Sequence, residues 1–191
     1  MICLIHCTLL LKKHLSTRER LGHYDEIYLR IFKGMDKKLS IIDLGAGING
    51  LSYTYIKKIG FHVKYIAIEA IGQFVNLMNN YFKNEKLGGK AIHLSLFEIE
   101  KLKKLIEKTK YPRVIFLLKT IDSLEMLEKN YSKKLISETM PLCDRFILSF
   151  STKSMAKRKK FNVRRNWILN FIKENFEVLD IFELESEKYI I

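Results

Sequence analysis

The sequence has few cysteines, no long apolar run and a shortage of acidic residues, and each of these excludes a class of protein. Its three cysteines, Cys3, Cys7 and Cys143, provide no framework of paired disulfides, which is typical of a reducing cytosol. Residues 2–11 are apolar but cover only half of the ~20 residues that a membrane-spanning helix needs, and they include His6. No basic segment precedes them and no small-residue cleavage site follows. We therefore predict a cytoplasmic protein without a signal peptide or a membrane anchor.

The same N-terminal segment lacks a complete metal site. Cys3, His6 and Cys7 could share one helical face, but no second cluster of ligands would complete a tetrahedral site. We predict no metal and interpret the segment as an amphipathic helix. No internal repeat, low-complexity segment or interdomain linker occurs, and 191 residues suit one α/β domain. We expect a monomer with a single domain over residues 1–191, on which a helical segment, residues 1–35, packs.

Acidic residues number 21 against 34 lysines and arginines, which gives a net charge of +13. Such an excess favours a polyanionic partner, although part of it could be only a solvated surface. The excess is localised, because the segment from residue 153 to residue 165 has seven basic residues and no acid, with Phe161 and Trp167 nearby for stacking. We predict RNA binding by these seven, with a solvated loop as the alternative: Lys153, Lys157, Arg158, Lys159, Lys160, Arg164 and Arg165.

A strand followed by a glycine turn organises the chain. Residues 40–44 fit a buried parallel strand, and Asp43, Gly45 and Gly47 then let the backbone turn tightly before a helix starts near Leu51. Glu69 ends the next apolar strand, where an acid can accept both ribose hydroxyls of an adenosine. An Asp-x-Gly-x-Gly turn with such an acid resembles the S-adenosylmethionine site of class I methyltransferases.

Strands and helices alternate with short connections throughout. We expect strands over residues 40–44, 63–68, 91–94, 114–118 and 145–150, and a closing hairpin over 176–184 and 189–191. Helices are expected over residues 51–59, 72–84, 99–108, 124–139 (in one or two pieces) and 166–175. This order predicts a doubly wound α/β fold with a mostly parallel, Rossmann-like sheet.

The helix that precedes the first strand carries two unusual signals. Ser16 and Glu19 have the spacing of a capping box, which predicts that a helix begins there, and apolar residues then repeat at helical spacing up to Ile31. Arg18 and Arg20 in its first turn oppose the helix dipole. We therefore expect an anionic group beside them.

Four motifs occur in an order that resembles the aminoglycoside-resistance 16S rRNA methyltransferases, which methylate N7 of a guanine in the ribosomal decoding site. They are residues 14–21, 43–49, 116–120 together with 124–125, and 149–154. The resemblance runs from about His14 to the C-terminus. It implies a class I methyltransferase with a seven-stranded-type sheet, S-adenosylmethionine as cofactor, and ribosomal RNA or the small ribosomal subunit as partner.

The resemblance also implies roles for individual residues. One group would hold the methionine end of the cofactor (His14, Leu15, Ser16 and Arg20), with Arg20 pairing the carboxylate. The others would contact the rest of it: Gly45, Ala46 and Gly47 through the backbone, Glu69 at the ribose, Ser95 and Leu96 beside the adenine, and Leu118 in the pocket wall. The basic segment from Lys153 to Arg165 would lie near the target nucleotide.

The sequence departs from the family at several positions. Ala46 stands where a cysteine is usual, Gly50 and Ser151 replace prolines, Ser95 replaces the acid beside the adenine, and Leu127 replaces a glutamine. Only 13 residues precede His14, whereas the resistance enzymes carry a helical N-terminal extension. Two alternatives therefore stay open: a class I methyltransferase for another RNA or a protein, and a relative that binds RNA without catalysis.

The chemistry of the implied target explains the absence of a catalytic motif. Guanine N7 has a free lone pair, so no proton has to be removed before it attacks a methyl group, and positioning supplies most of the catalysis. We therefore predict no catalytic acid or base, and no Asn-Pro-Pro-Tyr motif of the kind used for exocyclic amines is present.

Overall fold

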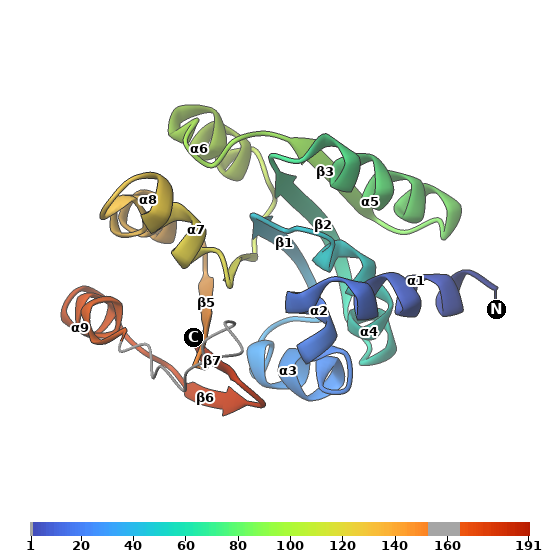
Figure 1. The fold of residues 1–191 in the computed structure, drawn as a ribbon, viewed down its shortest axis with the longest axis horizontal. Coiled ribbons are helices and arrows are strands. Elements are labelled where there is room, and N and C mark those ends of the chain that lie inside the picture. Colours follow the sequence, from blue (N-terminus) through green and yellow to red (C-terminus); the bar gives the residue numbers. More distant parts are fainter. Residues whose placement is uncertain (1, 153–164) are drawn as a thin grey trace.

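The computed structural model describes residues 2–152 and 165–191, and these form a seven-stranded sheet in the order β3-β2-β1-β4-β5-β7-β6 (Figure 1). The first five pair in parallel, and β7 runs antiparallel between β5 and β6. The strands are β1 (Lys38–Leu44), β2 (His62–Glu69), β3 (Gly89–His93), β4 (Arg113–Leu118), β5 (Arg145–Ser151), β6 (Ile181–Leu184) and β7 (Glu187–Ile190). The predicted doubly wound, mostly parallel fold is confirmed.

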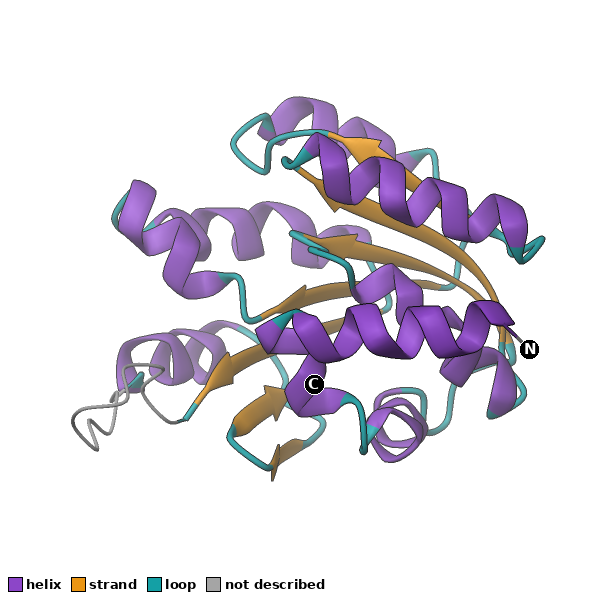
Figure 2. Ribbon diagram, turned by 45° about the vertical axis from the view of Figure 1, so that its right-hand side comes forward, coloured by secondary structure: helices purple, strands orange, loops and turns teal. Residues whose placement is uncertain are grey.

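Helices cover both faces of this sheet (Figures 1 and 2). One face packs against α3 (Tyr24–Ile31), α4 (Tyr53–Lys58) and α5 (Gly72–Asn84). The other packs against α6 (Ile99–Glu107), α7 (Ile121–Leu127), α8 (Tyr131–Thr139) and α9 (Asn166–Asn175), and short 3-10 turns lie at η1 (Asn49–Ser52) and η2 (Met140–Leu142). Central strands are apolar on both sides because neighbouring residues such as Ile115 and Phe116 enter different cores.

The predicted elements are found with small shifts at their ends. The helix predicted over residues 124–139 is two helices, α7 and α8, separated at Asn130, whose φ is +64°. The closing hairpin is present, but its first strand begins at Ile181. Phe176 packs against the core beside α9, and Leu179 and Asp180 already form backbone hydrogen bonds with Ile191 before this strand begins.

The capping box predicted at Ser16 is wrong. The N-terminal region consists of α1 (Ile2–Lys13) and α2 (Leu15–Arg20), and α2 has His14 as its N-cap without a side-chain cap. The Ser16 hydroxyl lies 2.9 Å from His14 Nδ1, and Glu19 pairs with Lys119. Ser16 therefore contacts the side chain of the neighbouring His14, and Glu19 pairs with a lysine distant in sequence, so neither side chain caps the helix. The side chains of Cys3, His6 and Cys7 lie outside the described part of the structure.

The parallel strands point in one direction, so their carboxyl ends gather at one edge of the sheet (Figure 2). Open α/β sheets bind ligands at this edge. Within the described residues, no helix has the length and apolar character needed to cross a membrane.

Candidate functional site

A cavity of about 470 Å³ opens at the carboxyl ends of β1, β2 and β4. Its lining brings together ten residues that the sequence placed in one site: His14, Ser16, Arg20, Gly45, Ala46, Gly47, Glu69, Ser95, Leu96 and Leu118. The side chain of Leu15, which was predicted with them, lies outside the described part of the structure. A cavity of this size is within the range of about 300–1,000 Å³ that holds small ligands and cofactors.

The turn after β1 requires glycine at two positions. Gly45 and Gly47 have φ values of +67° and +54°, which side chains rarely adopt. A Cβ at Gly45 would lie 2.7 Å from Thr120 Cγ2, and one at Gly47 would lie 3.3 Å from the imidazole Cε1 of His14. The bare backbone therefore lets the loop after β4 and the start of α2 close around the turn.

Glu69 is held at the cavity wall by two backbone N–H groups. The amides of Gly47 and Ile71 each donate to one of its carboxylate oxygens at 2.8 Å. A carboxylate has about four acceptor positions, so two stay free of these bonds. The geometry suits acceptance of two neighbouring hydroxyl groups, as predicted for an acid at the end of the second strand.

His14 lies over the glycine turn and contacts the edge of the Phe74 ring, with 5.7 Å between ring centroids. Burial lowers the pKa of His14, and the positive charge of Arg20 lowers it further, while Glu69 opposes them. The imidazole is therefore neutral at neutral pH, and its nitrogens can act as one donor and one acceptor.

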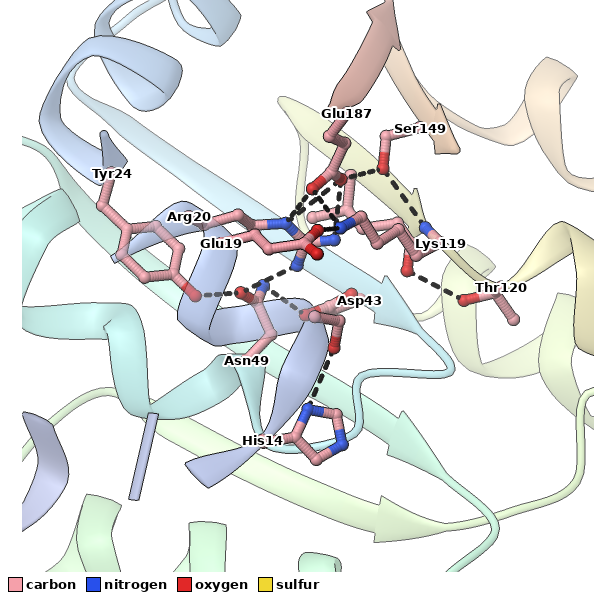
Figure 3. Close-up of polar contacts among 12 residues, drawn as sticks. His14, Glu19, Arg20, Tyr24, Asp43, Asn49, Lys119, Thr120, Ser149 and Glu187 are labelled. Carbon is pink, nitrogen blue, oxygen red and sulfur yellow. Dashed lines mark hydrogen bonds and ion pairs between the residues drawn. The ribbon is translucent and has the colours of Figure 1, made fainter. Parts of the chain in front are cut away.

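A buried cluster of charges closes one side of the cavity (Figure 3). Arg20 Nε and Nη2 donate to Glu187 at 2.9 and 2.8 Å, and Lys119 Nζ lies 3.3 Å from the same carboxylate. Ser149 also donates to Glu187, and Lys119 pairs with Glu19. Arg20 thus has an anionic neighbour, Glu187 from the last strand, but the predicted cause is wrong, because Arg18 and Arg20 lie in the last turn of α2, where the helix dipole favours cations.

The charge of Glu187 is stabilised by this cluster. Burial alone would raise the pKa of Glu187, but the charges of Arg20 and Lys119 and the hydrogen bonds from Arg20 and Ser149 outweigh it. The pKa therefore lies below the ordinary value, and the carboxylate is ionised at neutral pH. The Nη1 group of Arg20 does not bind Glu187 and lies 3.5 Å from Asn49 Oδ1.

Asn49 connects the strand β1 to Arg20. Its amide donates to Asp43 Oδ2 at 2.9 Å, and its carbonyl oxygen accepts from Tyr24 at 3.0 Å and from Arg20. Tyr65 also donates to Asp43. Burial raises the pKa of Asp43, and these hydrogen bonds oppose the increase. The network fixes the end of β1 and orients the guanidinium of Arg20 toward the cavity.

The far end of the cavity, beyond Glu69, is mostly apolar. Ser95, Leu96, Phe97 and Leu127 line it, and the Ser95 hydroxyl accepts a backbone hydrogen bond from Phe97 at 3.3 Å. Leu127 is 74% exposed at the rim. The described residues of this end include no acid and no glutamine, in agreement with Ser95 and Leu127 at the positions where the family has them.

Arg165 has an internal role in the structure, although the sequence placed it among the RNA-binding residues. It is buried, its Nε lies 3.1 Å from Asp122 Oδ1, and its Nη1 donates to the Ser151 carbonyl at 2.7 Å. The guanidinium is therefore already neutralised. The other six predicted residues lie outside the described part of the chain: Lys153, Lys157, Arg158, Lys159, Lys160 and Arg164.

Sequence reasoning missed the role of Glu187 and assigned none to Asn49 or Lys119. Glu187 lies in an acid-rich segment where nothing distinguishes it from its neighbours. The sequence did indicate a role for Lys119, since this residue directly follows a fully buried strand. In the structure its φ of +56° shows a constrained backbone at the cavity.

Comparisons with known proteins agree with this geometry. A family model described as "Ribosomal RNA methyltransferase (FmrO)" matches residues 4–167. Two curated relatives are named 16S rRNA (guanine(1405)-N(7))-methyltransferase: one from Proteus mirabilis is 28% identical (67% of this chain, 55% of the relative), and one from Micromonospora rosea is 26% identical (77% and 50%). The chain thus spans about half the length of the curated relatives that it matches.

Among solved structures, the 16S rRNA methylase ArmA superposes with a TM-score of 0.69 at 23% identity, over 95% of this chain and 87% of that chain. At this identity the likeness shows the fold alone.

Proposed function

This chain belongs to the ribosomal RNA methyltransferase (FmrO) family, and on that premise we propose that it methylates N7 of a guanine in the decoding site of 16S ribosomal RNA, with S-adenosylmethionine as the methyl donor. The names of the two relatives support the choice of base and atom. The observation that carries the proposal is the cavity at the carboxyl edge of the sheet, where the glycine turn, Glu69 and Arg20 meet.

The residues present fit S-adenosylmethionine. The bare backbone of the glycine turn lines the cavity, and Glu69 keeps two acceptor positions for the ribose hydroxyls. We assign the methionine carboxylate to Nη1 of Arg20, which Glu187 leaves unoccupied, and the neutral His14 to the same end of the ligand. The adenine would enter the apolar end beside Leu96 and Leu118, with shape and packing as the main recognition.

When bound, the cofactor would supply an electrophilic methyl group on a sulfonium. This chain's residues would hold that methyl in line with guanine N7, and no residue has to accept a proton because N7 carries a lone pair. Effective molarities of well-aligned reactions show that positioning alone lowers barriers by about 7–11 kcal/mol. A target guanine inside a stacked helix would have to be flipped outward, which a basic and partly aromatic rim would favour.

The first test is calorimetric titration of S-adenosylmethionine into the purified protein, followed by incubation of the protein with radiolabelled cofactor and small ribosomal subunits. We expect binding in the micromolar range and incorporation of label at one guanine, mapped as N7-methylguanine by borohydride–aniline cleavage. Absence of cofactor binding would contradict the proposal and favour a relative that only binds RNA. Cofactor binding together with methylation of tRNA or protein, but not of small subunits, would identify another substrate.

The basic segment is proposed as the contact to the target RNA. Substituting Lys157, Arg158, Lys159 and Lys160 by glutamine should weaken RNA binding and reduce the slope of log affinity against log salt by about 3, since each phosphate contact contributes about 0.7–0.9. Cofactor affinity should stay unchanged. Equal RNA affinity of the variant and the wild type would show that the segment is only a solvated surface.

A further inference from the structure

A second basic surface lies at the opposite edge of the sheet from the cavity. A groove of about 400 Å³ runs along the amino ends of β1 and β2. We define the basic groove by the cationic and titratable residues that line it: Lys38, Lys57, His62, Lys64, Lys86 and Lys110. Tyr53, Phe61 and Tyr111 contribute aromatic rings to its lining.

The fold assembles this groove from five separate segments. Lys38 lies opposite His62, and Ser40 lies opposite Lys64, in the parallel pairing of β1 with β2. Lys57 comes from the last turn of α4, while the other two lysines come from the connections that precede β3 and β4. No run of charged residues in the sequence therefore indicates the groove, which forms only when the fold places the amino ends of the strands side by side.

The charges of the groove are not neutralised within the described structure. All five of its lysines are exposed, none forms an ion pair with a described residue, and no described acid lines the groove. Exposed lysines elsewhere do find partners, as Lys58 does with Asp25 and Lys101 with Glu98. Five cations close together repel one another and attract an anion.

Aromatic rings accompany these cations. Tyr111 is 63% exposed at the rim, and the Arg113 guanidinium lies 3.8 Å from its ring centroid. Phe61 forms part of the lining, with Lys37 Nζ 4.0 Å from its ring centroid. A ring exposed beside several ammonium groups is the combination that binds nucleic acid, because phosphates meet the cations and an unpaired base can stack on the ring.

We propose that the basic groove binds the phosphate backbone of RNA. β1 has seven residues, so the groove and the cavity lie about 20 Å apart at the strand rise of ~3.3 Å per residue. One RNA can therefore contact both edges when its target base enters the cavity. The identification of this RNA as ribosomal rests on the proposed function; phosphate binding by the groove does not.

The test compares two triple variants that lose the same charge. In the first, Lys57, Lys64 and Lys110 are replaced by glutamine, which removes three exposed groove cations without altering a packed side chain. Binding of a labelled decoding-site fragment of 16S rRNA is measured by fluorescence anisotropy at several salt concentrations, without S-adenosylmethionine. We expect at least about tenfold weaker binding near 0.1 M salt and a salt slope reduced by about 2.

The matched control replaces Lys104, Lys129 and Lys173 by glutamine, three exposed lysines outside the groove. Its affinity should change less than about twofold. Equal losses in both variants would overturn the proposal, because they would reflect net charge alone. Since no cofactor is present, failure of methyl transfer would not affect this result.

A measurement on the wild-type protein makes the test independent of variant folding. Lysine acetylation is followed by mass spectrometry with and without the RNA fragment. RNA should protect Lys57, Lys64 and Lys110 and leave the three control lysines reactive. Equal protection of both sets, or protection of neither, would overturn the proposal.

Discussion

Two carboxylates of the site, Glu69 and Glu187, are held by different kinds of donor. Backbone amides hold Glu69 and leave acceptor positions toward the cavity. Side-chain cations hold Glu187, and its oxygens already accept from Arg20, Lys119 and Ser149. Glu69 is therefore suited to bind a ligand, and Glu187 to orient Arg20.

Replacing Glu69 by alanine should weaken S-adenosylmethionine binding by about 1–3 kcal/mol, because buried hydroxyl groups would lose a charged acceptor. Calorimetric titration measures the change. Glu100, exposed on α6, provides a control substitution to alanine that should leave the affinity unchanged. Wild-type affinity in the Glu69 variant would show that the ribose lies elsewhere.

Replacing Glu187 by glutamine should lower the free energy of unfolding by about 3–5 kcal/mol at neutral pH, because Arg20 would keep a buried charge without its partner. Urea unfolding measures the difference. The folded-state pKa of Glu187 is below its ordinary value of 4.5, so its contribution is complete above that pH and is lost as the pH falls through the folded-state pKa. The difference in the free energy of unfolding between wild type and variant should therefore become smaller in acid. A gap independent of pH would contradict the assigned ionisation.

At the scale of elements, the turn after β1 depends on the loop after β4. Gly45 approaches Thr120, whose hydroxyl in turn lies 3.3 Å from the Leu44 carbonyl. Both segments line the cavity, so the ends of these two parallel strands form one wall of it together.

Replacing Gly45 by alanine should destabilise the protein by about 1–3 kcal/mol, because the new Cβ meets Thr120 and the positive φ is strained. Cofactor affinity should fall as well. Chemical unfolding and calorimetry measure both effects. Gly22 is the matched control, since its Cβ would meet nothing within 4 Å and its φ is not positive; similar losses in both variants would contradict the steric argument.

At the scale of the whole molecule, a ligand that binds only the folded chain should raise its stability. S-adenosylmethionine at about 100 times its Kd should add about 2.7 kcal/mol to the free energy of unfolding. Urea unfolding with and without the cofactor measures this gain. The Glu69 variant at the same cofactor concentration should gain less, and an equal gain would indicate binding outside the cavity.

The sequence by itself determined the order of strands and helices and the chemistry of the turn. Apolar periodicity depends on near neighbours, so β4 and α5 were predicted within a residue of their observed ends. Gly45, Gly47 and Glu69 were also predictable, because a glycine or an acid directly after a predicted strand indicates a ligand site from adjacent residues alone.

Only the tertiary structure decided the partners of the charged side chains. Arg20 and Glu187 are 167 residues apart in sequence, and the capping box failed because Glu19 meets Lys119, 100 residues away. The basic groove likewise gathers lysines from five segments. Electrostatic partners depend on distance in space, which sequence patterns encode only for residues that are near neighbours along the chain.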